Sequence, residues 1–289
     1  MTWHRIAWGE VGFEIPDRWS PARIGSGELV FEEGGEVVLE VGWKRAGRGF
    51  SFARPLGDLR RRAARRGGVF LEQPVPGAPP ALEARGFEWR EKGRSTVGVL
   101  LFCRRCRTAS LLQFPGGGSG AGGERIRRIV SSFRDHRDDG RRAWRLFDAE
   151  AILPARFRLR RSRFETGRFE LEFDGPGTRL VLLRWAPAAV LLGRWPLADF
   201  AERFAGGEGL AFDRPGGCGP DVVEAWRRPR ASGPARLLAL LPRRRLRGIR
   251  VWHDAVRNRI LGVRLETRRG VPPPEWEELC RSWRCLDSA

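Results

Sequence analysis

The chain has 289 residues, of which 41% are hydrophobic and 31% are charged, and it includes 17 Phe and 12 Trp. This balance is typical of a folded protein with room for two domains, and it excludes a largely disordered chain. The formal charge of +19, from 54 basic and 35 acidic residues, favours a polyanionic partner such as an acidic protein, a nucleic acid or an anionic lipid surface.

The sequence also indicates which targeting signals and membrane spans to expect. The first 16 residues have no apolar stretch after a basic start, so we expect no secretory signal. The apolar runs, such as LVLLRW at 180–185, are far shorter than the roughly 20 residues of a membrane-spanning helix. Five cysteines in such a chain predict reduced thiols and a cytoplasmic location.

The first half of the chain predicts an antiparallel sheet. Alternating apolar residues on both sides of Gly34-Gly35 predict a β-hairpin over residues 29–41. Residues 53–66 then predict a helix with Pro55 in its first turn and Gly67 at its end. The apolar face of this helix consists of Leu56, Leu59 and Ala63.

A second hairpin and a second helix complete this half. Residues 97–114 read as two apolar strands joined by a short polar tip, CRRCR. Residues 123–134 predict a helix with an apolar stripe that ends at Phe133. The charged stretch around Gly140 is typical of a linker.

The second half repeats the pattern of the first half. Phe31 and Trp43 are 12 residues apart, and so are Phe173 and Trp185. Helices are predicted within 193–207 and 272–284, and a hairpin over 247–265 corresponds to 97–114. We therefore predict a first repeat over 1–134, a linker over 135–143 and a second repeat over 144–289.

Grouped strands with a few inserted helices predict the α+β class, with two duplicated domains that are each an antiparallel sheet covered by helices. The motifs FEIP at 13–16 followed by Trp19, the paired hairpins and IVSSF at 129–133 are similar to the PsbP/Mog1/DcrB-like family. This resemblance covers both halves and implies an α/β/α sandwich in each. It also implies an accessory or binding protein, because members of that fold are mostly not enzymes.

The Cys-x-x-Cys at the 97–114 tip is the first candidate site. Cys103 and Cys106 have the spacing of one half of a zinc site, and a closed site needs four ligands. In the repeat, His253 takes the place of Cys103, so a metal held by Cys103, Cys106 and His253 would staple the two domains if their tips meet. Cys280 or Cys285 could add a ligand. The alternatives are a redox pair, which a hairpin tip disfavours, or two unlinked thiols.

Basic runs are the second candidate site, because arginine binds carboxylates and phosphates through a planar fork. The predicted contacts to an anionic partner are Arg61, Arg62, Arg65, Arg66, Arg158, Arg160, Arg161, Arg243, Arg244 and Arg245. The alternative is a solvated surface that binds nothing.

The sequence favours a binding function over catalysis. It contains no G-x-S-x-G, phosphate-binding loop or H-E-x-x-H motif, and it predicts no cofactor. We therefore predict a non-catalytic accessory or adaptor protein with an acidic macromolecular partner. The alternatives are a nonspecific nucleic-acid-binding protein and a domain pair stapled by a structural zinc.

Overall fold

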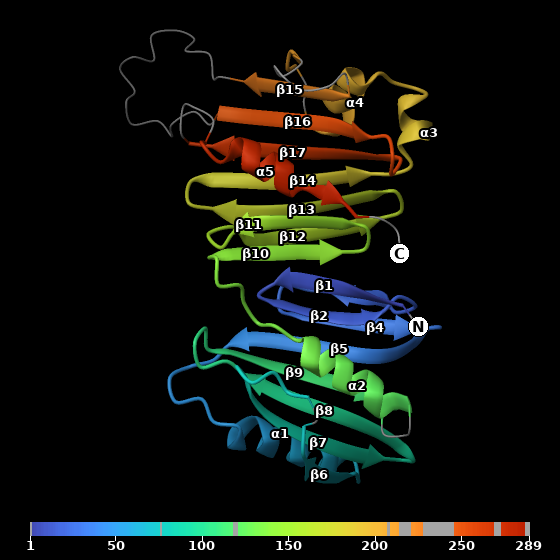
Figure 1. The fold of residues 1–289 in the computed structure, drawn as a ribbon, viewed down its shortest axis with the longest axis vertical. Coiled ribbons are helices and arrows are strands. Elements are labelled where there is room, and N and C mark those ends of the chain that lie inside the picture. The colour runs from blue at the N-terminus through green and yellow to red at the C-terminus, as the bar shows by residue number, and fades with distance from the viewer. Residues whose placement is uncertain are drawn as a thin grey trace. The chain divides into compact units, whose positions relative to one another are not determined.

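The computed structural model describes residues 2–75, 77–117, 121–206, 209–213, 221–227, 246–268 and 273–286. The chain divides into two compact units between Asp139 and Gly140, inside the predicted linker. Figure 1 shows the order of the strands within each unit.

The first unit is built on a seven-stranded antiparallel sheet in the order β3-β4-β5-β9-β8-β7-β6. A separate hairpin, β1–β2, precedes this sheet in the chain. The elements are β1 (Trp3–Gly9), β2 (Val11–Pro16), β3 (Ser20–Ile24), β4 (Glu28–Glu33), β5 (Glu36–Arg45), α1 (Ala53–Arg65), β6 (Val69–Gln73), β7 (Glu83–Glu91), β8 (Arg94–Phe102), β9 (Thr108–Pro115) and α2 (Ala121–Ser132).

The second unit has a six-stranded antiparallel sheet in the order β12-β13-β14-β17-β16-β15, so equivalent strands follow the same order as in the first unit. Its elements are β10 (Arg141–Leu146), β11 (Ala149–Pro154), β12 (Arg158–Glu165), β13 (Arg168–Gly175), β14 (Thr178–Trp185), α3 (Ala188–Leu192), α4 (Leu197–Phe204), β15 (Val222–Arg227), β16 (Leu246–Asp254), β17 (Arg259–Thr267), α5 (Trp276–Ser282) and β18 (Arg284–Cys285). No helix among the described residues is long and apolar enough to cross a membrane.

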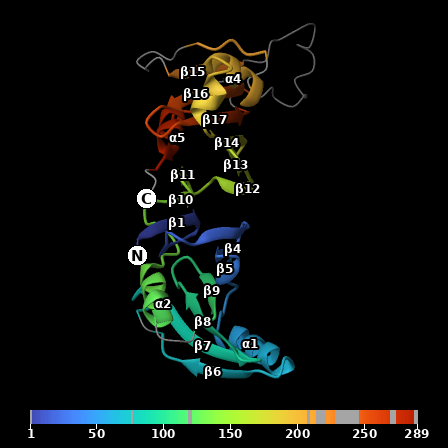
Figure 2. The same cartoon turned by 90° about the vertical axis from the view of Figure 1, so that its right-hand side faces the viewer.

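The predicted α/β/α sandwich, with sheets covered by helices, is wrong. Strands contain far more residues than helices in each unit, and the helices of the described residues are short, from five residues in α3 to 13 in α1. In the first unit α1 packs on β6 and β7, at one end of the sheet, whereas α2 packs on β2. Figure 2 shows α1 and α2 on opposite sides of β7 and β8. One physical reason lies at 193–207, where Gly193 caps the end of the five-residue helix α3 and Pro196 caps the start of α4, which is limited to eight residues.

Local sequence signals account for the hairpins and helix faces that do form. Gly34 and Gly35 both have positive φ angles, 60° and 85°, as a two-residue hairpin turn with the twist of its strands requires. The predicted face of α1 is confirmed, because Leu56, Leu59 and Ala63 are its buried residues.

A glycine faces an aromatic ring at the same position of both sheets. Gly98 on β8 pairs with Phe87 on β7, and Gly248 on β16 pairs with Trp226 on β15. A Cβ atom would lie 2.0 Å from the Phe87 ring at Gly98 and 2.2 Å from the Trp226 ring at Gly248. Each ring therefore lies in space that only a glycine leaves open on the neighbouring strand.

A partly buried ion-pair network ties the β10–β11 hairpin to the sheet of the second unit. Asp148, in the turn of that hairpin, accepts hydrogen bonds from Arg184 on β14 and from Nε of Arg259 on β17, the latter at 2.7 Å. Burial alone would raise the pKa of Asp148, but the hydrogen bonds and charges of Arg259 and Arg184 lower it below its usual 3.8.

Replacement of the glycine that faces Phe87 tests this packing. We expect Gly98→Ala to lower the free energy of unfolding by about 1–3 kcal/mol, because the added methyl group displaces the ring. Urea denaturation measures the change. Gly42→Ala on β5 is the matched control, since its Cβ meets nothing within 4 Å. Equal effects of the two variants would contradict this packing.

The Asp148 network predicts a dependence of stability on pH. Asp148→Asn should lower the free energy of unfolding at pH 7 by about 3 kcal/mol, because it leaves two guanidinium groups without their shared carboxylate. The pKa of Asp148 is lower in the folded protein, so its contribution is complete above pH 3.8 and is lost as the pH falls below that value. Urea titrations from pH 7 to pH 2.5 should show the wild type and the variant converging; a constant difference would contradict the network.

Candidate functional site

The Cys-x-x-Cys lies in the tight loop that joins β8 to β9. The Cys103 amide donates to the Thr108 carbonyl at 3.0 Å, and the Arg107 amide donates to the Cys103 carbonyl at 2.9 Å. Arg107 adopts a positive φ of 61°, which closes the loop. We call residues 103–107 the knuckle. Its fold is local and follows from the pairing of the two strands.

A second segment reaches the knuckle from the end of α2. Phe133 is fully buried and stacks on Phe13 of β2, with ring centroids 6.1 Å apart. The next residue, Arg134, exchanges two backbone hydrogen bonds with Gly12, of 2.8 and 2.7 Å. These contacts fix the direction of the chain where Asp135 and His136 begin.

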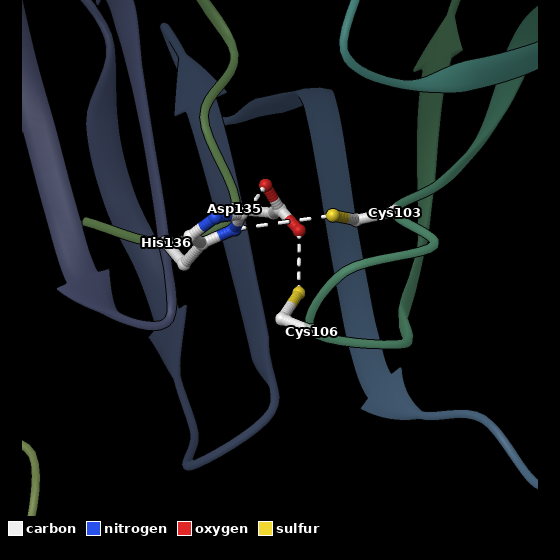
Figure 3. A group of neighbouring side chains, drawn as sticks. All are labelled: Cys103, Cys106, Asp135 and His136. Atoms are coloured by element: carbon white, nitrogen blue, oxygen red, sulfur yellow. Dashed lines mark hydrogen bonds and ion pairs between the residues drawn. The ribbon is translucent and has the colours of Figure 1, made fainter. Parts of the chain in front are cut away.

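Cys103, Cys106, Asp135 and His136 point toward one another (Figure 3). Cys106 Sγ lies 2.6 Å from Asp135 Oδ2, and His136 Nδ1 lies 2.9 Å from Asp135 Oδ1. Cys103 Sγ lies 3.9 Å from His136 Nδ1. One potential ligand atom from each residue lies within 4.8 Å of all the others. We call these four residues the cysteine–aspartate–histidine cluster.

The cluster is largely buried. Cys103 is 3% exposed and Asp135 is 6% exposed, whereas Cys106 and His136 are half-buried. Burial, and then the hydrogen bond to Asp135, raise the pKa of the Cys106 thiol to about 12. At neutral pH, Cys106 is therefore a protonated thiol that donates to the Asp135 carboxylate.

The arginines of the knuckle bind acceptors outside the cluster. Arg104 pairs with Glu83, Arg105 pairs with Asp138, and Arg107 donates to the Gly47 carbonyl. Asp135 thus lies buried between a thiol and an imidazole, without an arginine or lysine partner among the described residues.

The cluster does not have the geometry of an activated thiol nucleophile. In a Cys-His-Asp catalytic triad the carboxylate and the thiol bind opposite nitrogens of the imidazole ring. Here His136 presents the same Nδ1 atom to Asp135 and to Cys103. Cys103 is also nearly inaccessible to a substrate, and the pKa of Cys106 is raised, not lowered.

The other residues of the predicted metal site belong to the second unit. His253 lies on β16, and its Nδ1 is 3.8 Å from Asp221 Oδ1. Cys280 lies in α5 and Cys285 in β18, and both are buried. Burial, followed by the charge of Asp148, raises the pKa of Cys285 to about 12. The participation of His253 in a metal site stays a prediction.

Sequence reasoning missed Asp135 and His136 as partners of the cysteines. Both fall in the stretch that the sequence assigns to the linker, one and two residues after the predicted helix ends. The available signal was the Asp-His pair that begins two residues after Phe133, the aromatic residue that matches Trp283 in the repeat.

The predicted arginines of the first unit gather on the exposed side of α1 and just after its end. Arg61, Arg62, Arg65 and Arg66 are exposed, and we call them the α1 face. Arg61 pairs with Asp58, and Arg66 lies 3.8 Å from Glu91. Arg62 and Arg65 form no ion pair among the described residues, so this side of the helix carries uncompensated positive charge.

The arginines of the second unit lie on β12, an edge strand of its sheet. Arg158, Arg160 and Arg161 are exposed. Arg160 is 3.7 Å from Glu172 and 3.9 Å from Asp174. Arg243, Arg244 and Arg245 lie outside the described residues.

Comparisons with known proteins assign no family. No family model and no curated protein matches the chain. A crystal structure from Bacteroides thetaiotaomicron is 12% identical over 53% of each chain, with a TM-score of 0.30, so the match spans about half of that protein. The structure of MucB in complex with MucA(peri) is 10% identical over 96% of this chain and 83% of that one, with a TM-score of 0.21. The PsbP/Mog1/DcrB-like resemblance stays a prediction from the sequence.

Proposed function

We propose that this protein is a non-catalytic accessory protein that binds an acidic segment of a macromolecular partner on the α1 face. The observation that carries the proposal is the charge of this helix. Between Ala53 and Arg65 it has five arginines and one acidic residue, Asp58. Such a surface attracts carboxylates and raises the rate at which an acidic partner associates.

A hollow beside the end of α1 extends the positive surface. A cavity of about 1080 Å³ is lined by Arg66, Trp89, Arg90, Lys92 and Arg94, together with three glutamates. Lys92 and Arg94 are exposed and form no ion pair among the described residues. An extended acidic segment on the α1 face could continue into this hollow and place a carboxylate near either residue.

The distribution of charge favours an acidic protein over a nucleic acid. Arg160 on β12 lies close to acidic neighbours, and the arginines of the first unit gather on one helix instead of following an extended groove. Nucleic-acid binding without sequence preference needs a basic path that follows the phosphate backbone. A short basic helix face fits a short acidic segment better.

The expected cytoplasmic location is part of the proposal. Cys103, Cys106, Cys280 and Cys285 are free thiols, as a reducing compartment requires. The free thiols support a cytoplasmic location whatever the partner is.

A charge reversal on the α1 face tests the proposed function. The probes are a fluorescein-labelled poly-glutamate peptide and a single-stranded oligonucleotide of equal charge, and fluorescence anisotropy at increasing salt measures binding. The double variant Arg62→Glu/Arg65→Glu should weaken peptide binding about tenfold or more, because two attractive charges become repulsive. Both side chains are exposed, so we expect the fold to be retained.

The matched control makes the same charge change on the second unit. Arg158→Glu/Arg161→Glu on β12 should leave peptide binding within about twofold of the wild type. Equal losses in the two variants would mean that only net charge matters. Tighter binding of the oligonucleotide, lost equally in both variants, would favour nonspecific nucleic-acid binding instead.

A further inference from the structure

We propose that Cys103, Cys106, Asp135 and His136 bind one zinc ion that fastens the knuckle to the segment leaving α2. This inference is independent of the proposed function, because none of the four residues belongs to the α1 face. It also replaces His253 with His136 as the histidine ligand.

The positions of the four ligand atoms carry the proposal. Zinc binds thiolate sulfur at about 2.3 Å and imidazole nitrogen or carboxylate oxygen at about 2.0–2.2 Å in a tetrahedron, so ligand atoms lie about 3.3–3.8 Å apart. The four atoms here already lie within 4.8 Å of one another, and the Cys103–His136 distance is 3.9 Å. Zinc binding would move Cys106 Sγ and Asp135 Oδ2, now 2.6 Å apart, away from each other and would draw the more distant ligand atoms together.

The chemical types of the four ligand atoms indicate which metal would bind. Two thiolates, one imidazole and one carboxylate suit zinc, whereas calcium and magnesium prefer oxygen ligands alone. Four protein ligands leave no position for a substrate or an activated water, which is the arrangement of a structural site.

The surroundings of His136 orient its ring for this role. Metal-bound histidines usually donate their second ring N–H to a carboxylate. His136 turns Nδ1 toward the cluster, and its Nε2 lies 3.7 Å from Asp138 Oδ1. Asp138 is in turn paired with Arg105 of the knuckle. The outer partner of the histidine is therefore held by the same loop that supplies the cysteines.

Charge balance gives an independent argument. Asp135 is a buried carboxylate whose ion-pair partner among the described residues is His136, at 2.9 Å, and a buried charge needs a counter-charge. Zinc would supply two positive charges against one carboxylate and two thiolates, which leaves a net charge of −1.

The binding step releases protons. Cys103 and Cys106 each lose one proton as their sulfurs bind the metal, and the hydrogen bond from Cys106 to Asp135 is replaced by two bonds to zinc. No oxidant or reductant takes part. Two segments 29 residues apart, at Cys106 and Asp135, become joined through the ion.

Cobalt substitution tests the site in the full-length chain. Protein stripped with a chelator under reducing conditions is titrated with Co²⁺, and thiolate-to-cobalt charge-transfer absorption reports cysteine ligation. We expect one Co²⁺ per chain and its displacement by one Zn²⁺. Zinc should also raise the melting temperature of the stripped protein, because the ion binds the folded state.

Matched variants identify the ligands. Asp135→Asn and His136→Ala should each weaken zinc binding about tenfold or more in a chelator competition assay. Cys106→Ser should lower the charge-transfer absorption, and far-ultraviolet circular dichroism of each metal-free variant checks its fold. His253→Ala and Cys280→Ser, which change the same residue types in the second unit, should bind as the wild type does.

Two results would overturn the proposal. One is the absence of thiolate-to-cobalt absorption in folded, reduced wild-type protein. The other is a loss of binding in His253→Ala that equals the loss in His136→Ala, which would assign the histidine ligand to the second unit. If a metal-free variant fails to fold, the wild-type titration and the His253→Ala titration still decide between these outcomes.

Discussion

The pairing of Gly12 with Arg134 is the constraint on which the chemistry of the first unit depends. These two backbone hydrogen bonds, with Phe133 stacked on Phe13 beside them, fix the point at which the chain leaves α2. They place the side chains of Asp135 and His136 against the knuckle, which lies about 30 residues earlier in the chain. Without this joint the two thiols of the knuckle would face solvent and the proposed partners would lie on an unanchored segment.

The second unit has the corresponding backbone pairing after its last helix, with different side chains. Trp283 is buried at the position of Phe133, and the following residues, Arg284 and Cys285, pair with β11. At the positions that follow the aromatic residue, Cys285 and Leu286 take the places of Asp135 and His136. The two halves therefore share a scaffold, and among the described residues the full set of four potential ligands occurs in the first unit.

Local patterns in the sequence predicted the hairpins and the core, because alternation and turn glycines act over a few residues. Phe31 and Phe173, which the repeat places at equivalent positions, are both fully buried. The sandwich was wrong because helix length depends on where packing lets each segment begin and end, as in α4, which starts after Pro196 and ends at Phe204. The role of His136 could not be read from the sequence, since its contact with Cys103 spans 33 residues and depends on how the end of α2 packs.

The opposition of a ring and a glycine on neighbouring strands has a consequence for which substitutions each unit tolerates. One unit has Phe87 over Gly98, and the other has Trp226 over Gly248. The ring differs between the two units, whereas the glycine is the same in both. A larger residue at either glycine would require the loss of the facing ring in the same step, so the ring can be exchanged for another ring more easily than the glycine can be replaced.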